Sequence, residues 1–167
     1  MTTSADIAER PTWRFVAAHP AHLIAFGFGT GLVRIAPGSV GTLVALPIYW
    51  LLESVLPTPQ FLLLLGVLFV IGAWACEVTG RALGVADYSG MVWDEVVAFL
   101  LVLVFTPATL VWQAFAYVCF RFFDIAKPPP VRQVDARVKG GLGVMLDDLF
   151  AAIYALLVIA VVKRIVA

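Results

Sequence analysis

Four long apolar runs are the sequence feature that most constrains the fold. They cover residues 40–56, 61–78, 96–123 and 149–162, and shorter polar or charged stretches separate them. A helix of about 20 apolar residues crosses a hydrocarbon core of about 30 Å, so these runs suit membrane-spanning helices. Only 13% of the residues are charged and 62% are hydrophobic, whereas soluble domains have about 25% charged residues. The chain is therefore predicted to be an integral membrane protein.

The third run is too long for one helix, and Thr106 and Pro107 fall near its middle. Proline has no backbone N–H and disfavours a helical conformation in the residue before it, so we expect a hairpin of two helices here. The fold prediction is an all-α membrane bundle of about four to five transmembrane helices with interfacial loops. Residues 1–20 are predicted to form an N-terminal cytoplasmic or interfacial segment, and residues 21–167 a single membrane-embedded domain.

The stretch 121–148 holds nine of the 22 acidic and basic residues of the chain, between two apolar runs. Three prolines at 128–130 forbid a helix through its middle, and Gly140, Gly141 and Gly143 allow sharp turns. So many charges beside a membrane would be costly without a function. We interpret this stretch as a charged, glycine-hinged loop at the bilayer surface that carries an active site.

The number of crossings predicts which loops share a side of the membrane. If every apolar run crosses and the third is a hairpin, the loops at 27–42, 77–95 and 121–148 emerge on one face. That face carries most of the loop Lys and Arg residues, so the positive-inside rule makes it cytoplasmic. The residues capable of chemistry are then expected together on the cytoplasmic face.

Two pairs of adjacent carboxylates precede apolar runs: Asp94 with Glu95, and Asp147 with Asp148. Acidic side chains also favour helix N-termini, so capping is the alternative interpretation. Clustered on one face, however, they form an oxygen-rich site that suits Mg²⁺. We predict Asp94, Glu95, Asp147 and Asp148 as metal ligands, and Asp94, Glu95, Asp124 and Asp148 as catalytic residues. The sequence leaves open which carboxylate acts as the base.

Arg121, Asp124 and Lys127 are spaced three residues apart, which places them along one helical face. A surface ion pair at a helix end is one interpretation. The other is a phosphate site, because Arg offers a planar fork and Lys a point charge to phosphate oxygens. We predict that Arg121 and Lys127 bind substrate, and Glu77 and Asp87 could join the acidic set.

The segment 21–42 contains five glycines and several small hydroxyl residues, and is predicted to be a loop or a half-buried re-entrant segment. Successive backbone N–H groups near a helix start can bind an anion. Ser39 and Thr42 are accordingly predicted as substrate-binding residues. Glycine-rich turns are common, however, so this segment alone does not define a phosphate site.

Several classes of protein are excluded by what the sequence lacks. The net charge is zero, so nothing indicates a nucleic-acid partner. The only histidines, His19 and His22, lie near the N-terminus, which argues against a phosphohistidine mechanism. Cys76 and Arg81 are too close for a cysteine phosphatase loop. The phosphatase mechanism that these exclusions leave is metal-assisted attack of water on a phosphoester.

Four motifs stand out in order along the chain: GTGLVRIAPGSVGTL at 29–43, VWDEVV at 92–97, FRFFDIAKPPPV at 120–131 and GGLGVMLDD at 140–148. In their order and spacing they resemble the motifs of the phosphatidylglycerophosphatase A family. The resemblance covers most of residues 25–165, with Ala98 where that family usually has glycine.

This resemblance implies a Mg²⁺-dependent, multi-pass enzyme of the bacterial inner membrane that hydrolyses phosphatidylglycerophosphate to phosphatidylglycerol and inorganic phosphate. The membrane domain at 21–167 is then the catalytic domain, and its partner is a phospholipid substrate. An ion or proton transporter that uses its carboxylate clusters, or a non-catalytic membrane scaffold, are the alternatives. The oligomeric state is left open.

Overall fold

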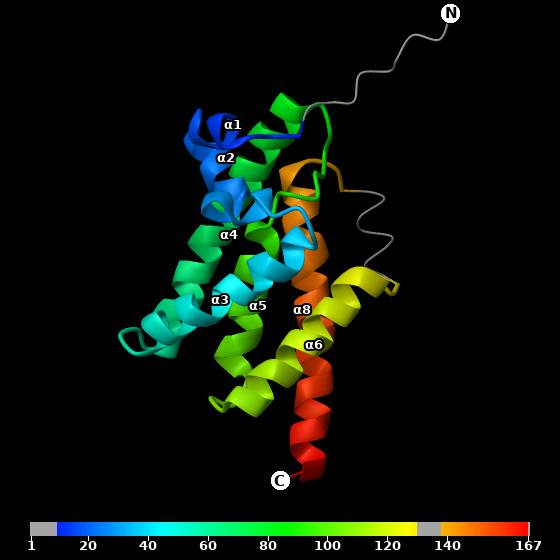
Figure 1. The fold of residues 1–167 in the computed structure, drawn as a ribbon. Helices are drawn as coiled ribbons and strands as arrows, with labels where there is room; N and C mark the ends of the chain where they lie inside the picture. The colour runs from blue at the N-terminus through cyan, green and yellow to red at the C-terminus, as the bar shows by residue number, and fades with distance from the viewer. Residues whose placement is uncertain (1–9, 130–137, 167) are drawn as a thin grey trace, which may run out of the picture.

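The computed structural model describes residues 10–129 and 138–166, and all regular secondary structure in these ranges is helical (Figure 1). The predicted all-α class is therefore confirmed for the described residues, while the first nine residues of the predicted N-terminal segment lie outside them. The elements are α1 (Trp13–Ala17), α2 (Pro20–Ala25), the 3-10 helix η1 (Gly27–Leu32), α3 (Pro37–Glu53), α4 (Thr58–Leu83), α5 (Trp93–Phe105), α6 (Leu110–Ala126) and α8 (Gly141–Val166).

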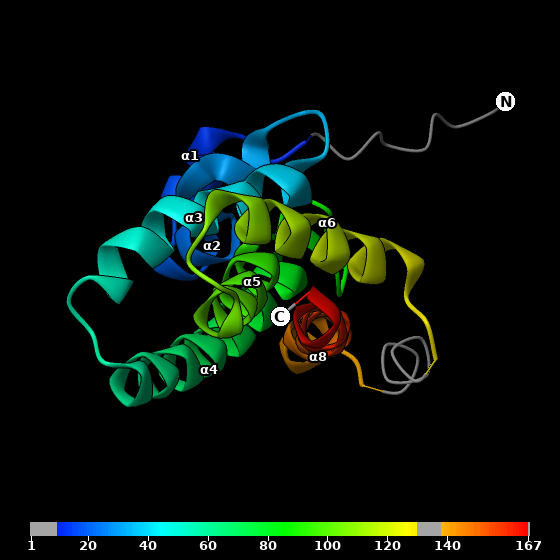
Figure 2. The same ribbon diagram turned by 90° about the horizontal axis from the view of Figure 1, so that it is seen from below.

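Helix α5 forms the centre of the bundle. It contacts α3, α4, α6 and α8, and Figure 2 shows it surrounded by them. Four side chains in the middle of α5 are fully buried: Phe99, Leu100, Val102 and Leu103. A helix that is apolar on all sides can be buried on all sides. The uninterrupted apolar sequence after Glu95 thus explains the central position of α5.

A proline separates α5 from α6, as predicted. Helix α5 ends at Phe105, and Thr106 is extended, with φ −90° and ψ 139°, immediately before Pro107. Residues before proline avoid the helical region. Thr109 then caps α6 by accepting a hydrogen bond from the backbone N–H of Trp112 (3.4 Å). The predicted break in the third apolar run is confirmed.

Two helices, α4 and α8, are long and apolar enough to cross a membrane, judged by length and composition alone. Each has 26 residues, which corresponds to about 39 Å at about 1.5 Å per residue. Helices α3, α5 and α6 are shorter, with 17, 13 and 17 residues. Among the described residues there are thus two candidate spans, and the count of four to five is not confirmed.

The helices alternate in direction. Figure 1 shows α3, α5 and α8 running one way and α4 and α6 the other. The N-terminal ends of the first three therefore lie toward the same end of the bundle as the C-terminal ends of the other two. This arrangement gathers most of the polar connections near one end of the molecule.

Helix α8 begins eight residues earlier than the sequence predicted, at Gly141 instead of Leu149. At this start the Glu77 carboxylate of α4 accepts a hydrogen bond from the backbone N–H of Gly141 (2.8 Å). A helix N-terminus has unsatisfied N–H groups, and this carboxylate satisfies one of them. The predicted loop at 121–148 is accordingly too long, since α6 also continues to Ala126. Residues 130–137 of that loop lie outside the described residues.

The prediction of a loop or re-entrant segment at 21–42 is also wrong in part. Short helical elements occupy most of this segment. The first of them, α2, is capped by His19, whose ring nitrogen accepts a hydrogen bond from the Ala21 backbone N–H (3.1 Å). Pro37 occupies the first turn of α3, where its missing N–H costs nothing. The glycine-rich composition is consistent with close packing of these elements as well as with a loop.

Candidate active site

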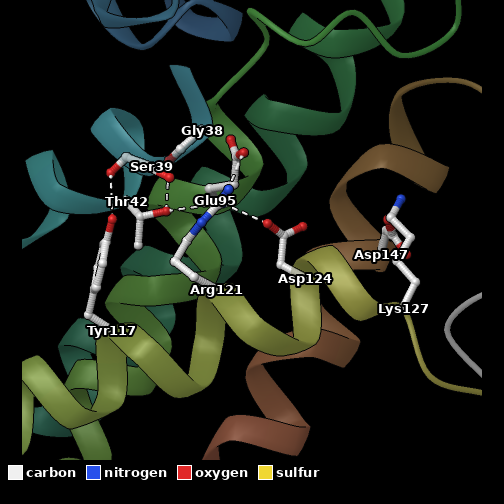
Figure 3. Close-up of polar contacts among 9 residues, drawn as sticks. All are labelled: Gly38, Ser39, Thr42, Glu95, Tyr117, Arg121, Asp124, Lys127 and Asp147. Carbon is white, nitrogen blue, oxygen red and sulfur yellow. Dashed lines mark hydrogen bonds and ion pairs between the residues drawn. The ribbon is translucent and has the colours of Figure 1, made fainter. Parts of the chain in front are cut away.

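A polar cavity of about 250 Å³ lies where five parts of the chain meet. These parts are the start of α3, the connection between α4 and α5, the first turn of α5, the end of α6 and the second turn of α8. Figure 3 shows several of the side chains in this region. The charged lining consists of six carboxylates, Asp87, Asp94, Glu95, Asp124, Asp147 and Asp148, and two cations, Arg121 and Lys127.

Asp94, Glu95 and Asp148 form a carboxylate trio. Each offers one oxygen, and these oxygens lie within 4.8 Å of one another. Asp94 is 8% exposed and Asp148 is 3% exposed. One buried oxygen of each residue has no hydrogen-bond partner within the described part of the chain. Because a buried carboxylate oxygen without a partner is costly, the arrangement fits a cation that these oxygens would coordinate.

The first turn of α5 positions Asp94 and Glu95. Helix N-termini favour negative side chains, so the local sequence and the dipole of α5 agree. The indole N–H of the preceding residue, Trp93, donates a hydrogen bond to the backbone carbonyl of Leu68 in α4 (3.2 Å). This bond fixes the start of α5 against α4 and thereby fixes the direction of the two carboxylates.

Arg121 of α6 connects the trio to its surroundings (Figure 3). Its Nη1 lies 2.6 Å from Asp124 Oδ2 and 3.4 Å from Glu95 Oε1. Gly38 packs against the same pair, since a Cβ at this position would lie 2.0 Å from Glu95 Oε1. Glycine at the start of α3 therefore leaves the room that Glu95 and Arg121 occupy.

Lys127 ends α6 in a left-handed conformation, with φ 42°. Its ammonium forms an ion pair with Asp147 of α8. Asp148, the next residue of α8, instead offers an oxygen to the trio. The second carboxylate pair is therefore divided, with Asp148 in the trio and Asp147 beside Lys127.

The cavity has a strongly negative charge balance. Six carboxylates against two cations leave an excess of four negative charges if all groups are ionised. Burial raises the pKa of Glu95 to about 7, and repulsion from Asp124 adds to the shift. Burial and the neighbouring carboxylates therefore both disfavour the ionised form of Glu95. A multivalent cation would stabilise the ionised form of the whole cluster.

The predicted hydroxyl residues Ser39 and Thr42 do not line this cavity. Thr42 donates a hydrogen bond to the Gly38 carbonyl (2.8 Å) and lies 3.5 Å from Arg121 Nη1. The backbone carbonyl of Ser39 accepts a hydrogen bond from the Tyr117 hydroxyl (3.4 Å). Their role in substrate binding stays a prediction.

The two additional acids suggested by the sequence behave differently. Asp87 lines the cavity, whereas Glu77 binds Arg81 (2.7 Å) and the start of α8. Ser89 and Met91 also line the cavity without having been predicted. No sequence pattern identified them, because they lie in the irregular connection between α4 and α5. They reach the cavity only because the backbone of this connection passes beside it.

Comparisons with known proteins identify the family of the chain. The family model described as Phosphatidylglycerophosphatase A matches residues 23–163, and no solved structure matches the chain. "Phosphatidylglycerophosphatase A" of Haemophilus influenzae is 39% identical over 157 residues, which cover 93% of this chain and 96% of the relative. The Escherichia coli protein of the same name is 38% identical over 149 residues, which cover 89% and 84%.

A third relative, from Bacteroides thetaiotaomicron, is 36% identical over 151 residues, which cover 86% of this chain and 94% of the relative. Its name assigns it provisionally as a phosphatidylinositol-3-phosphatase. The resemblance drawn from the four sequence motifs is thus confirmed by a family match over most of the chain. The chain belongs to the phosphatidylglycerophosphatase A family and is a phosphatase that acts on a phosphomonoester.

Proposed function

We propose that the protein is a Mg²⁺-dependent phosphatase that hydrolyses phosphatidylglycerophosphate to phosphatidylglycerol and inorganic phosphate in phospholipid biosynthesis. The names of two relatives suggest the substrate. The single structural observation that carries the proposal is the trio of Asp94, Glu95 and Asp148, with ligand oxygens within 4.8 Å of one another.

The trio has the donor chemistry that Mg²⁺ requires. Mg²⁺ prefers oxygen ligands and is commonly held by a few carboxylates together with water or phosphate oxygens. Asp94, Glu95 and Asp148 each have one buried oxygen available among the described residues. When bound, the cation would polarise the phosphate and make a water molecule more nucleophilic. Asp147, the fourth predicted ligand, would act as a neighbouring charge that holds Lys127.

The reaction also requires proton transfers that the chain itself can perform. The water oxygen forms a bond to phosphorus, the bond from phosphorus to the glycerol oxygen breaks, the water loses a proton and the leaving oxygen gains one. The carboxylates of the trio and Asp124 are the groups placed to accept and return that proton.

Arg121 and Lys127 are proposed to bind the phosphate oxygens. A phosphate monoester carries about 1.5 to 2 negative charges near neutral pH, and the surrounding carboxylates would repel it. The Arg121 guanidinium already contacts Glu95 and Asp124, but its Nε has no hydrogen-bond partner in the described ranges. Donor capacity therefore remains for a phosphate.

We also propose a multi-pass protein of the bacterial inner membrane, with the active site toward the cytoplasm. Helices α4 and α8 would cross the bilayer, and α3 with the α5 and α6 hairpin would lie beside them. Large apolar side chains are exposed along these helices, for example Leu63, Val70 and Leu157. Exposed apolar surface of this extent suits contact with lipid.

Phosphate release by the purified protein tests the activity. We expect turnover of phosphatidylglycerophosphate with Mg²⁺, loss of turnover with a chelator, and recovery when Mg²⁺ is restored. Phosphatidylinositol 3-phosphate, the substrate class in the name of the third relative, serves as the competing substrate. Turnover that persists in excess chelator would overturn the metal dependence, and a preference for the inositol lipid would overturn the substrate.

Cysteine labelling tests the orientation. In a background without Cys76 and Cys119, a cysteine replaces Arg34 near the site or Ser54 at the other end of α3. We expect an impermeant thiol reagent applied outside the cytoplasmic membrane to label position 54 and not position 34. The reverse pattern would place the active site on the opposite face.

A further inference from the structure

A second, apolar cavity lies beside the active site. Its volume is about 220 Å³, and Asp94 is the one charged residue in its lining. The other lining residues are apolar or glycine and come from three helices. Those that carry the argument are Leu62, Gly66 and Phe69 of α4, Ala98 and Leu101 of α5, and Leu149 of α8.

The geometry of α4 and α8 explains this cavity. The two helices meet closely where a Cβ at Gly141 would lie 1.9 Å from the Ala73 carbonyl oxygen. The N-terminal part of α4 diverges from the C-terminal part of α8, as Figures 1 and 2 show, and α5 lies between them on the side of α3 and α6. The resulting groove lies between the two helices that are long and apolar enough to cross a membrane. It is therefore placed to open toward lipid.

Gly66 marks the accessible side of the groove. It is an exposed residue of α4, and a Cβ built on it would meet no atom within 4 Å. The missing side chain thus leaves space that no neighbouring residue fills. Glycine lowers helix stability relative to most residues, so its presence in the middle of α4 calls for a reason.

Asp94 links the groove to the active site, because it lines both cavities and belongs to the trio. A ligand that fits both would be apolar along one part and would carry its phosphate next to the carboxylate cluster. A phospholipid has this division. The groove volume exceeds the roughly 150 Å³ that holds a benzene-sized apolar molecule, so it accommodates a segment of one acyl chain.

We propose that the groove between α4 and α8 binds the first part of one acyl chain of the phospholipid substrate and so positions its head group. This inference rests on the proposed function. In a bilayer the chain is already in an apolar environment, so the groove contributes orientation more than affinity. The enzyme should accordingly prefer long-chain over short-chain substrate.

Filling the groove tests this role. Gly66→Phe places a ring in the open space, and Val70→Phe, one turn further along α4 at an exposed position outside the lining, is the matched control. We expect Gly66→Phe to lower the ratio of long-chain to short-chain phosphatidylglycerophosphate turnover on the order of tenfold, chiefly through kcat. Val70→Phe should leave that ratio unchanged. Equal ratios in both variants and the unaltered protein would overturn the proposal.

Photo-crosslinking of the unaltered protein is the second measurement, and it does not depend on the folding of a variant. Phosphatidylglycerol with a diazirine near the start of one acyl chain should label Leu101, Leu149 or Phe69 more than phosphatidylcholine with the same group does. Equal labelling by both lipids, or labelling confined to outward residues such as Leu63, would show that the groove does not select substrate. If the unaltered protein hydrolyses no phosphatidylglycerophosphate, the proposed function fails, whereas hydrolysis without groove labelling defeats only this inference.

Discussion

The two carboxylate pairs look alike in the sequence but are used differently in the structure. Asp94 and Glu95 lie in the first turn of α5, and both join the trio. Asp147 and Asp148 lie in the second turn of α8, and only Asp148 joins it. Asp147 instead pairs with Lys127. Two factors decide whether a carboxylate joins the trio: the position of its pair relative to the helix start, and the helix that faces the pair.

This difference shows that adjacent acids are not equivalent functional units. The first pair benefits from the dipole of α5 and is close to Arg121, whereas the second lies inside a helix and depends on α8 starting early. We therefore expect substitutions within the second pair to have unequal effects. The following predictions test that expectation in order of decreasing size.

The largest effects are expected at the trio. Asp94→Asn and Asp148→Asn each remove a proposed charged oxygen ligand, so turnover should fall about a thousandfold or more. Mg²⁺ binding by calorimetry should weaken in parallel. Glu53→Gln, at the far end of α3, is the control and should change neither value. Near-normal turnover in Asp148→Asn would show that the two pairs do not share one site.

Substitution of Arg121 should have the next largest effect. Arg121→Ala removes the proposed donor for phosphate, and we expect turnover to fall about a hundredfold. Arg121→Lys should restore only part of the rate, because an ammonium does not replace the planar fork. The Mg²⁺ concentration that gives half-maximal rate should move little. Full rescue of Arg121→Ala by added Mg²⁺ would assign this residue to the cation site instead.

The pair of Asp147 and Lys127 should matter less than the trio. Asp147→Asn and Lys127→Ala should each lower turnover about tenfold, because each loses one charge next to the proposed phosphate site but no trio oxygen. The double variant should be close to either single variant, since the two groups act together. A loss in Asp147→Asn as large as that in Asp148→Asn would remove the distinction between the two members of the pair.

The smallest effect concerns the early start of α8. Glu77→Ala removes the acceptor of the Gly141 N–H, so the first turn of α8 should loosen and the midpoint Tm should fall by a few degrees in a thermal unfolding scan. Arg81→Ala is the matched control, because it removes only the exposed partner of the same carboxylate, and exposed ion pairs contribute little. An unchanged Tm in Glu77→Ala would mean that the α4 contact does not fix the start of α8.

The sequence by itself determined the all-helical class, the break at Pro107 and the residue types of the site. Each follows from local chemistry: apolar runs favour helices, proline interrupts them, and carboxylates beside Arg and Lys suit a metal and a phosphate. The family motifs added the identity of the reaction. These properties depend on residues that are close together in the chain, so the local sequence is sufficient to predict them.

Only the tertiary structure decided how the charged residues are divided. The start of α8 depends on Glu77, which lies 64 residues away along the chain, and the fate of Asp147 depends on Lys127 at the end of α6. Likewise, the entry of Asp87 into the cavity and the groove beside Gly66 result from how helices cross. Contacts between distant segments set these features, and a periodic pattern in the sequence records which face of a helix is apolar but not which partner covers it.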